Sequence, residues 1–115
     1  MTEKYKKIIL LDLDGVLNTY SGNFDKNIIP DVKSGAKEFL EELAQDYDVK
    51  IFTARNRLAA SKWLIENKLD TFITDITNVK EPAYLHVDDR CICFNGNFKN
   101  TINEIKSFKA YWKQI

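Results

Sequence analysis

Two aspartates near the start of the chain directly follow a run of large apolar residues. In IILLDLDG, Asp12 and Asp14 are separated by one leucine and are followed by Gly15. The continuous apolar run predicts a strand over residues 7–13 that is buried on both faces. Because ionised carboxylates lose hydration when they are buried, a strand that ends in two of them is costly. The pattern therefore predicts chemistry at the end of this strand.

Polar residues also follow two later predicted strands. DVKIFT ends in Thr53, and AYLHVDD ends in Asp88 and Asp89. The carboxyl ends of parallel strands meet at one edge of a sheet, which is where such sheets place their sites. Lys80 lies in the loop before the second of these strands and is expected to reach the same edge.

Several carboxylates at one edge of a sheet repel one another, and something must offset this repulsion. Two of them about 4 Å apart repel by about 1 kcal/mol in water and by about 4 kcal/mol at an effective dielectric constant near 20. A shared proton or a bound divalent cation relieves this repulsion, and ligands that are all oxygen favour Mg²⁺ over Zn²⁺. For a single aspartate a helix cap or turn is the simpler explanation. Two acidic pairs at separate strand ends favour a metal site formed by Asp12, Asp14, Asp88 and Asp89.

The residue types suggest roles in phosphoryl transfer. Asp12 is closest to the strand end and can attack phosphorus to form an aspartyl phosphate. Asp14, two residues on, would point the same way in extended backbone. It can protonate the leaving oxygen and later take a proton from water.

The phosphate itself needs donors and positive charge. The Thr53 hydroxyl and the amides of Ala54 and Arg55 are expected to face it, at the positive end of the following helix. Lys80 is expected to neutralise the phosphate and the ionised nucleophile. For the Arg55 side chain, a substrate contact and a surface salt bridge remain equally good interpretations.

The elements that must position these residues alternate along the chain. Equal numbers of acidic and basic residues and 44% hydrophobic residues fit one globular domain, residues 1–115. Alternation of strands and helices predicts an α/β domain with an open, mainly parallel sheet. The predicted strands are residues 7–13, 48–53, 71–76 and 83–89, and the predicted helices begin near residues 31, 57 and 101. The third and fourth strands are joined by fewer than the roughly twelve residues that a parallel crossover usually needs, so this crossover is expected to lack a full helix.

Several details of the helices and loops follow from local signals. Asp31 is the expected cap of the first helix, and Thr101 with Glu104 forms a capping box for the last. The last helix should run to about residue 113 and bury its apolar face. That face contains Ile102, Ile105, Phe108 and Trp112, and both tryptophans are assigned to helix packing. The segment 91–94, CICF, is a possible fifth strand in which both cysteines are small buried hydrophobic residues.

Composition also restricts the partners. The formal net charge is zero, which argues against bulk attraction to nucleic acid or to an anionic membrane. No stretch approaches the roughly 20 apolar residues that span a bilayer. We therefore expect a cytoplasmic protein with no membrane partner. The site residues described above indicate that its substrate is phosphorylated.

Four segments together resemble the haloacid dehalogenase-like phosphohydrolase superfamily. The first, ILLDLDGVL, matches an apolar strand followed by DxDG, and VKIFTAR matches a strand that ends in Thr or Ser. Lys80 in NVKEP matches the isolated lysine of the third motif, and LHVDDR matches the acidic pair of the fourth. The motifs occur in order and cover about residues 8–90.

The resemblance implies a three-layer, Rossmann-like domain around a mainly parallel sheet. It makes Asp12 the nucleophile and a Mg²⁺ ligand, and Asp14 the acid/base and a ligand through its carbonyl group. Of the acidic pair, Asp89 is preferred as the direct ligand, with Asp88 as its support. The phosphate and substrate residues are then Leu13, Thr53, Ala54, Arg55 and Lys80.

The resemblance also predicts how much of the chain can cover the site. About 16 residues separate Gly15 from the first predicted helix, enough for a small flap but not for a large cap domain. An open site suits a macromolecular phosphate end, or a small molecule enclosed by oligomerisation. Tyr20 and Phe24 in the flap either stack on a substrate ring or, as we prefer, pack on the domain surface.

A second class of function uses similar residues. A receiver-like signalling domain also combines an acidic cluster, a threonine, a lysine and Mg²⁺, and it accepts a phosphoryl group without turnover. Its acceptor aspartate would lie on a middle strand of the sequence and its acidic pair at the first strand. DxDG at the first strand favours the phosphohydrolase.

Overall fold

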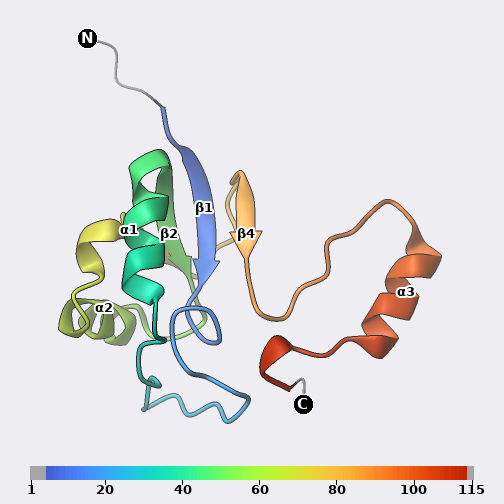
Figure 1. The fold of residues 1–115 in the computed structure, drawn as a ribbon, viewed down its shortest axis with the longest axis horizontal. Coiled ribbons are helices and arrows are strands. Elements are labelled where there is room, and N and C mark those ends of the chain that lie inside the picture. The colour runs from blue at the N-terminus through green and yellow to red at the C-terminus, as the bar shows by residue number, and fades with distance from the viewer. Residues whose placement is uncertain (1–4, 114–115) are drawn as a thin grey trace.

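The computed structural model describes residues 5–113 and contains a single parallel sheet within them. Its strand order is β3-β2-β1-β4, and every neighbouring pair is parallel. The strands are β1 (Lys7–Asp12), β2 (Tyr47–Phe52), β3 (Asp75–Thr77) and β4 (Leu85–Val87). The predicted α/β, Rossmann-like fold is confirmed (Figure 1).

The first strand is central and buried, as its apolar run predicts. Ile9, Leu10 and Leu11 are almost completely inaccessible to solvent. β1 pairs with β2 on one side and β4 on the other, with Leu11 opposite Val87. Since all three strands run in the same direction, their carboxyl ends open onto one edge of the sheet.

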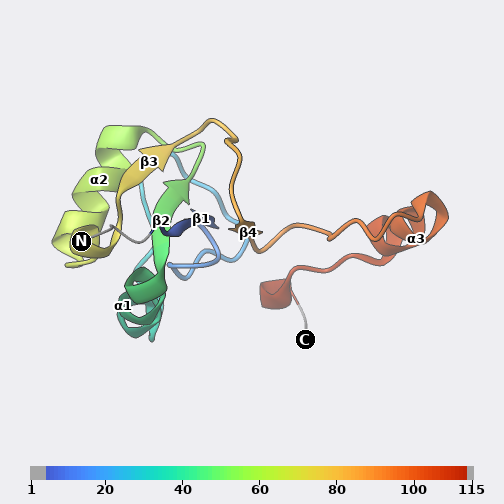
Figure 2. The ribbon, with the colours of Figure 1, turned by 90° about the horizontal axis from the view of Figure 1, so that it is seen from above.

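Two helices cover one face of the sheet. α1 (Ala36–Asp46) connects β1 to β2, and α2 (Arg57–Glu66) follows β2 (Figure 2). Because β1, β2 and β3 succeed one another in the same direction across the sheet, right-handed crossovers place both helices on the same side. Leu40, Val49, Ile51, Trp63 and Leu64 belong to the single core between these layers.

The opposite face is crossed by an irregular segment, residues 78–84, which forms the third layer in place of a helix. The Tyr84 amide donates to the Ile8 carbonyl oxygen at 2.8 Å, and Lys50 pairs with Glu81 at 3.1 Å. The predicted short crossover without a full helix is confirmed.

The first helix begins later than predicted. Asp31 does not cap it, because the backbone of residues 31–33 is used elsewhere. The Thr19 amide donates to the Asp31 carbonyl oxygen at 2.9 Å, and the Lys33 amide donates to the Leu17 carbonyl oxygen at 2.8 Å. This pairing holds the segment extended until Gly35, whose φ of 89° precedes α1.

Two strand predictions also need correction. The third strand is displaced to Asp75–Thr77, because residues 70–72 form a 3₁₀ turn. The segment 91–94 is not a strand: it leads away from the sheet without pairing with it, and β4 remains the edge strand. Cys91 and Cys93 are consequently exposed rather than buried.

The last helix is shorter than predicted and does not cover the sheet. α3 (Phe98–Ser107) is capped by the Asn97 side chain rather than by Thr101, and both ribbon views place it beyond the β4 edge. Ile102 and Ile105 are therefore exposed. The radius of gyration is 15.4 Å, above the about 13 Å of a compact chain of this length. After α3 the chain returns to the sheet and ends its described part in a short 3₁₀ helix, Tyr111–Lys113.

No helix within residues 5–113 combines the length and the apolar character needed to cross a bilayer.

Candidate active site

Three carboxylates meet at the edge where β1 and β4 end. Asp12 is the last residue of β1, and Asp88 and Asp89 directly follow β4. One carboxylate oxygen from each lies within 4.8 Å of the others. The side-by-side parallel pairing of β1 and β4 causes this convergence, and the sequence predicted it for these three residues.

The cluster strongly perturbs Asp12. Burial, the charge of Asp88, and the hydrogen bond and charge of Asp89 together raise the pKa of Asp12 to about 8. The Leu13 amide, which donates to Asp12 Oδ1 at 2.9 Å, acts in the opposite direction. Without a cation, Asp12 therefore keeps its proton at neutral pH.

A hard divalent cation fits this donor set. All three donors are carboxylate oxygens, close enough for one ion to contact each, and the raised pKa reports the negative charge that such an ion would neutralise. Asp12, Asp88 and Asp89 are the residues that would hold Mg²⁺. The preference for Asp89 over Asp88 as the direct ligand stays a prediction.

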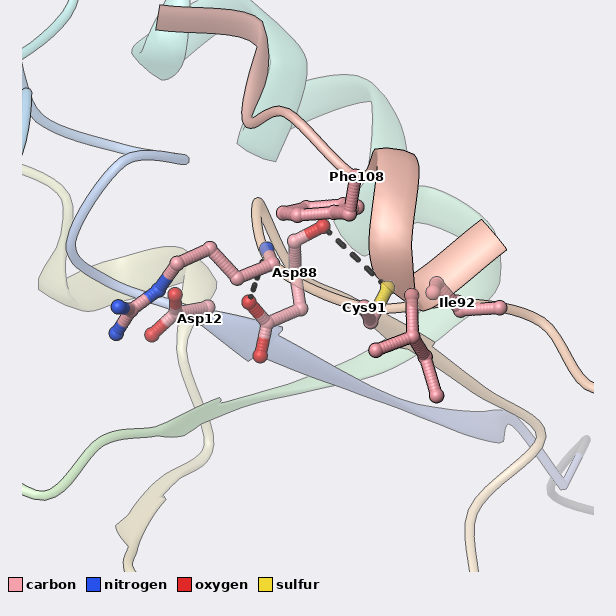
Figure 3. Close-up of a pocket in the computed structure, with 7 residues that line it drawn as sticks. Asp12, Asp88, Cys91, Ile92 and Phe108 are labelled. Atoms are coloured by element: carbon pink, nitrogen blue, oxygen red, sulfur yellow. Dashed lines mark hydrogen bonds between the residues drawn. The ribbon is translucent and has the colours of Figure 1, made fainter. Parts of the chain in front are cut away.

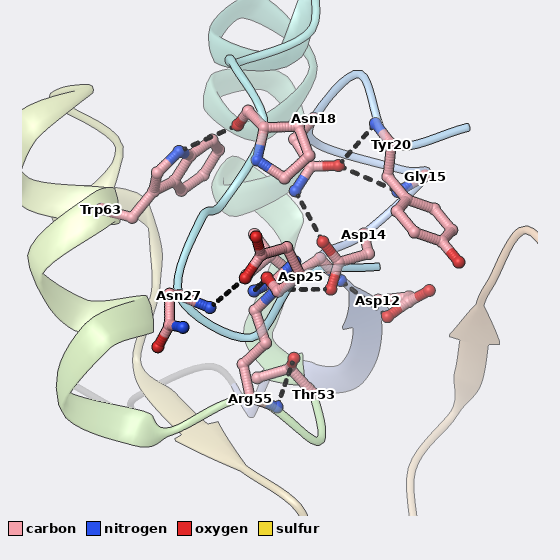
Figure 4. A network of polar contacts seen from close by, with 12 residues as sticks. Asp12, Asp14, Gly15, Asn18, Tyr20, Asp25, Asn27, Thr53, Arg55 and Trp63 are labelled. Atoms are coloured by element: carbon pink, nitrogen blue, oxygen red, sulfur yellow. Dashed lines mark hydrogen bonds and ion pairs between the residues drawn. The ribbon is translucent and has the colours of Figure 1, made fainter. Parts of the chain in front are cut away.

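The Asp14 carboxylate lies outside this cluster. Its Oδ1 accepts a hydrogen bond from Asn18 Nδ2 at 3.0 Å, and its Oδ2 is paired with Arg55 Nε at 2.8 Å. Figure 4 shows the Asp12 carboxylate turned away from this network. The strand ends at Asp12, and residues 13–17 form a tight turn in which the Leu17 amide donates to the Leu13 carbonyl oxygen at 3.0 Å. The expectation of extended backbone through Asp14 was therefore wrong.

Asn18 organises this turn and was missed in the sequence. It is completely buried, and its Oδ1 accepts from the amides of Gly15, at 3.1 Å, and Tyr20, at 3.0 Å. Its amide group donates to Asp14 (Figure 4). Asparagine is a common turn residue, so its place four residues after Asp14 was the available signal.

Arg55 is a buried partner of Asp14. Its side chain is only 3% exposed, Nη1 donates to the Asp25 carbonyl oxygen at 3.0 Å, and the guanidinium lies 4.5 Å from the Phe24 ring centroid. Nη2 is buried and has no hydrogen-bond partner among the described residues. Of the two interpretations left open, the salt bridge is present but is internal rather than on the surface.

The other predicted phosphate residues are only partly arranged for that role. Thr53 is buried, and its hydroxyl accepts from the Arg55 amide at 3.1 Å, so this amide is engaged within the loop. The Leu13 amide is engaged by Asp12, whereas Ala54 is exposed. Lys80 follows the end of β3, but its side chain is exposed and forms no ion pair within residues 5–113. Their contact with phosphate stays a prediction.

The segment after α3, residues 108–113, returns to the sheet and covers one side of the acidic cluster. Trp112 Nε1 donates to Asp89 Oδ2 at 2.7 Å, and the Tyr111 hydroxyl donates to the Gly15 carbonyl oxygen at 2.6 Å. The Trp112 ring also meets Tyr20 edge to face at 5.7 Å. The assignment of Trp112 to helix packing was wrong, because its helix ends before it and its indole reaches the acidic cluster instead.

Position 15 requires glycine because the turn after β1 passes very close to the Asp89 carboxylate there. The φ of Gly15 is 83°, and a Cβ atom there would lie 2.1 Å from Asp89 Oδ2. Only glycine allows the turn after β1 to pass so close to this carboxylate.

A cavity of about 630 Å³ opens beside the cluster. Asp12 and Asp88 line one part of it, and Ile92 and Phe108 line another (Figure 3). The Asp12 carboxylate is thus accessible from this cavity.

Comparison with known proteins supports the fold. A solved structure of a conserved protein from Bacteroides thetaiotaomicron aligns with 93% of this chain and 95% of its own, with a TM-score of 0.61 and 19% sequence identity. No protein-family model matches the chain, and no curated protein matches it significantly. At this identity the likeness establishes the α/β fold that the two chains have in common.

Proposed function

We propose that this protein is a Mg²⁺-dependent phosphohydrolase that cleaves phosphomonoesters through an aspartyl phosphate on Asp12. The observation that carries the proposal is the convergence of Asp12, Asp88 and Asp89 at the edge of the sheet, with the pKa of Asp12 raised to about 8. A buried carboxyl group that holds its proton partly because like charges surround it can lose that proton when a cation binds beside it. The four segments that resemble the phosphohydrolase superfamily support the same assignment.

Asp12 supplies the nucleophile. Its Oδ1 accepts a hydrogen bond from the Leu13 amide at 2.9 Å, and we assign the attack on phosphorus to its Oδ2. In the first step a bond forms between this oxygen and phosphorus while the bond to the leaving alcohol breaks. A bound Mg²⁺ would neutralise the carboxylates and the phosphate oxygens during this step.

Asp14 is proposed to move protons. It would give a proton to the leaving oxygen and then take one from the water that hydrolyses the acyl phosphate. Asn18 and Arg55 together occupy one acceptor site on each of its oxygens. A carboxylate has about four such sites, so capacity remains for a water molecule. Arg55 and Asn18 thereby orient the group rather than block it.

The first experiment measures phosphate release from p-nitrophenyl phosphate with Mg²⁺. The wild-type protein should turn over, and Asp12→Asn should abolish hydrolysis with the fold retained. Asp31→Asn is the matched control, because Asp31 is exposed and lies outside the cluster. Retained activity in Asp12→Asn would refute the nucleophile assignment.

The second experiment separates hydrolysis from simple phosphoryl acceptance. Asp14→Asn should slow the breakdown of the intermediate, so that a stoichiometric burst of p-nitrophenol is followed by slow turnover. Unchanged burst and steady-state rates would count against the role of Asp14. Stable labelling of the wild-type protein by acetyl phosphate, without phosphate release, would instead identify a receiver-like acceptor.

A further inference from the structure

The cavity beside Asp12 is lined by carboxylates on one part and by apolar side chains on another. Asp12 and Asp88 form its polar part, and Ile92 and Phe108 contribute apolar surface (Figure 3). Ile105 also lines the cavity and completes this apolar wall. Phe108 is 39% exposed and Ile105 is 61% exposed, so both present apolar surface to the cavity that no other part of the described chain covers. A volume of about 630 Å³ lies within the range of about 300–1,000 Å³ typical of small-molecule sites.

The wall comes from α3 and its flanks, which stand off the β4 edge of the sheet. This part of the chain is tied back to the catalytic edge by two hydrogen bonds, from Trp112 to Asp89 and from Tyr111 to the Gly15 carbonyl oxygen. The anchors lie within four residues of Phe108 in the sequence. They therefore fix the distance between the apolar wall and the carboxylates.

We propose that this cavity binds the leaving group of the substrate, and that this group is an aromatic ring carried by the phosphate. The inference rests on the proposed function, because it places the phosphate at Asp12. The ring then lies against Phe108 and Ile105. An aromatic rather than a saturated group is favoured because Phe108 offers a ring for stacking and Arg90, which also lines the cavity, offers a planar guanidinium.

The binding test uses phosphonates, which are not hydrolysed, in the presence of Mg²⁺. Methylphosphonate reports the phosphate end alone, and benzylphosphonate adds one aromatic ring. Burying about half of a ring against the wall should make benzylphosphonate bind about tenfold more tightly. Cyclohexylmethylphosphonate should gain less, because it cannot stack.

Variants of the wall locate the preference. Phe108→Ser and Ile105→Ser should remove the advantage of benzylphosphonate and leave the affinity for methylphosphonate unchanged. Ile102→Ser is the matched control, since Ile102 is an equally exposed isoleucine on α3 that does not line the cavity. The unchanged affinity for methylphosphonate also shows that each variant is folded.

The wild-type chain contains a second, independent readout. Cys91 lines the cavity and Cys93 does not, although both thiols are exposed. Benzylphosphonate should therefore slow the alkylation of Cys91 by N-ethylmaleimide several-fold and leave Cys93 unaffected, as measured by peptide mass spectrometry. Methylphosphonate should protect Cys91 much less.

The outcomes distinguish this inference from the proposed function. Equal affinity for the methyl and benzyl compounds would overturn the aromatic leaving-group site and leave the phosphohydrolase intact. Equal affinity for the benzyl and cyclohexylmethyl compounds would overturn the aromatic assignment, and a benzyl preference that survives Phe108→Ser and Ile105→Ser would overturn the assignment of the wall. Binding of none of the phosphonates, together with no turnover, would overturn the proposed function and this inference with it.

Discussion

Replacing Asp12 by asparagine should change how the stability of the metal-free protein depends on pH. The folded protein holds the pKa of Asp12 at about 8, far above the ordinary value of 3.8. Between these two values the folded chain keeps a proton that the unfolded chain has released. The free energy of unfolding therefore falls as the pH rises through this window, and the stabilisation is complete only below it.

The size of the effect follows from the same shift. Each pH unit inside the window changes the free energy of unfolding by about 1.4 kcal/mol per group, and the whole window corresponds to about 6 kcal/mol without screening. Because Asp12 is only partly buried, solvent screening reduces this, and we expect about 2–3 kcal/mol. Asparagine cannot ionise, so the advantage of Asp12→Asn over wild type should already be partly present at pH 5 and should grow with pH until it reaches that amount at pH 8.5.

Urea unfolding in the presence of a chelator, at pH values from 5 to 8.5, measures the difference directly. Asp31→Asn again serves as the control and should follow the wild-type slope. Adding Mg²⁺ should stabilise the wild type increasingly as the pH rises, since the ion and the proton compete for the same carboxylate. Parallel pH profiles for wild type and Asp12→Asn would refute the argument that burial and the neighbouring carboxylates raise the pKa of Asp12.

Three further substitutions test the surroundings of the cluster. Gly15→Ala places a methyl group 2.1 Å from Asp89 Oδ2, so the affinity for Mg²⁺ should fall at least tenfold by calorimetry, and an unchanged affinity would contradict the close approach. Trp112→Phe keeps an aromatic ring at this position but removes the indole N–H that donates to Asp89. The free energy of unfolding should fall by about 1–2 kcal/mol in urea titrations. Arg55→Met leaves the Asp14 carboxylate without its buried partner and should cost about 3 kcal/mol, whereas a loss below about 1 kcal/mol would show that the pair is not effectively buried.

The parts of the fold that the sequence predicted correctly depend on local pattern. The run from Ile8 to Leu11 is apolar at every position, which favours a strand buried on both faces, and β1 is central. The strand ends carry the polar residues, so the convergence of Asp12 with Asp88 and Asp89 followed once the strands were known to be parallel.

The parts that failed depend on contacts between distant segments. Asp31 and the Thr101–Glu104 pair are good local capping signals, yet neither begins its helix. The backbone around Asp31 is used by the turn that contains Asn18, which no local rule weighs against a cap. In the same way, nothing in the sequence near Asp14 revealed that its partner would be Arg55, 41 positions away in the chain.

The position of α3 affects the surroundings of the acidic cluster, because α3 lies beyond the β4 edge rather than against a face of the sheet. Ile105 of α3 and Phe108 directly after it line the cavity at Asp12, and Trp112, in the segment that returns to the sheet, donates to Asp89. The acidic cluster and the apolar wall are therefore held by the same segment.

This shared segment separates two kinds of perturbation. Gly15→Ala acts on Asp89 from the β1 side and should weaken Mg²⁺ binding while the advantage of benzylphosphonate over methylphosphonate persists. Trp112→Phe releases Asp89 and the wall together, so it should reduce the affinity for Mg²⁺ and that advantage in parallel. Measuring both quantities in both variants tests whether the return of the chain after α3 positions the metal and the leaving group as one unit, and independent changes in Trp112→Phe would show that it does not.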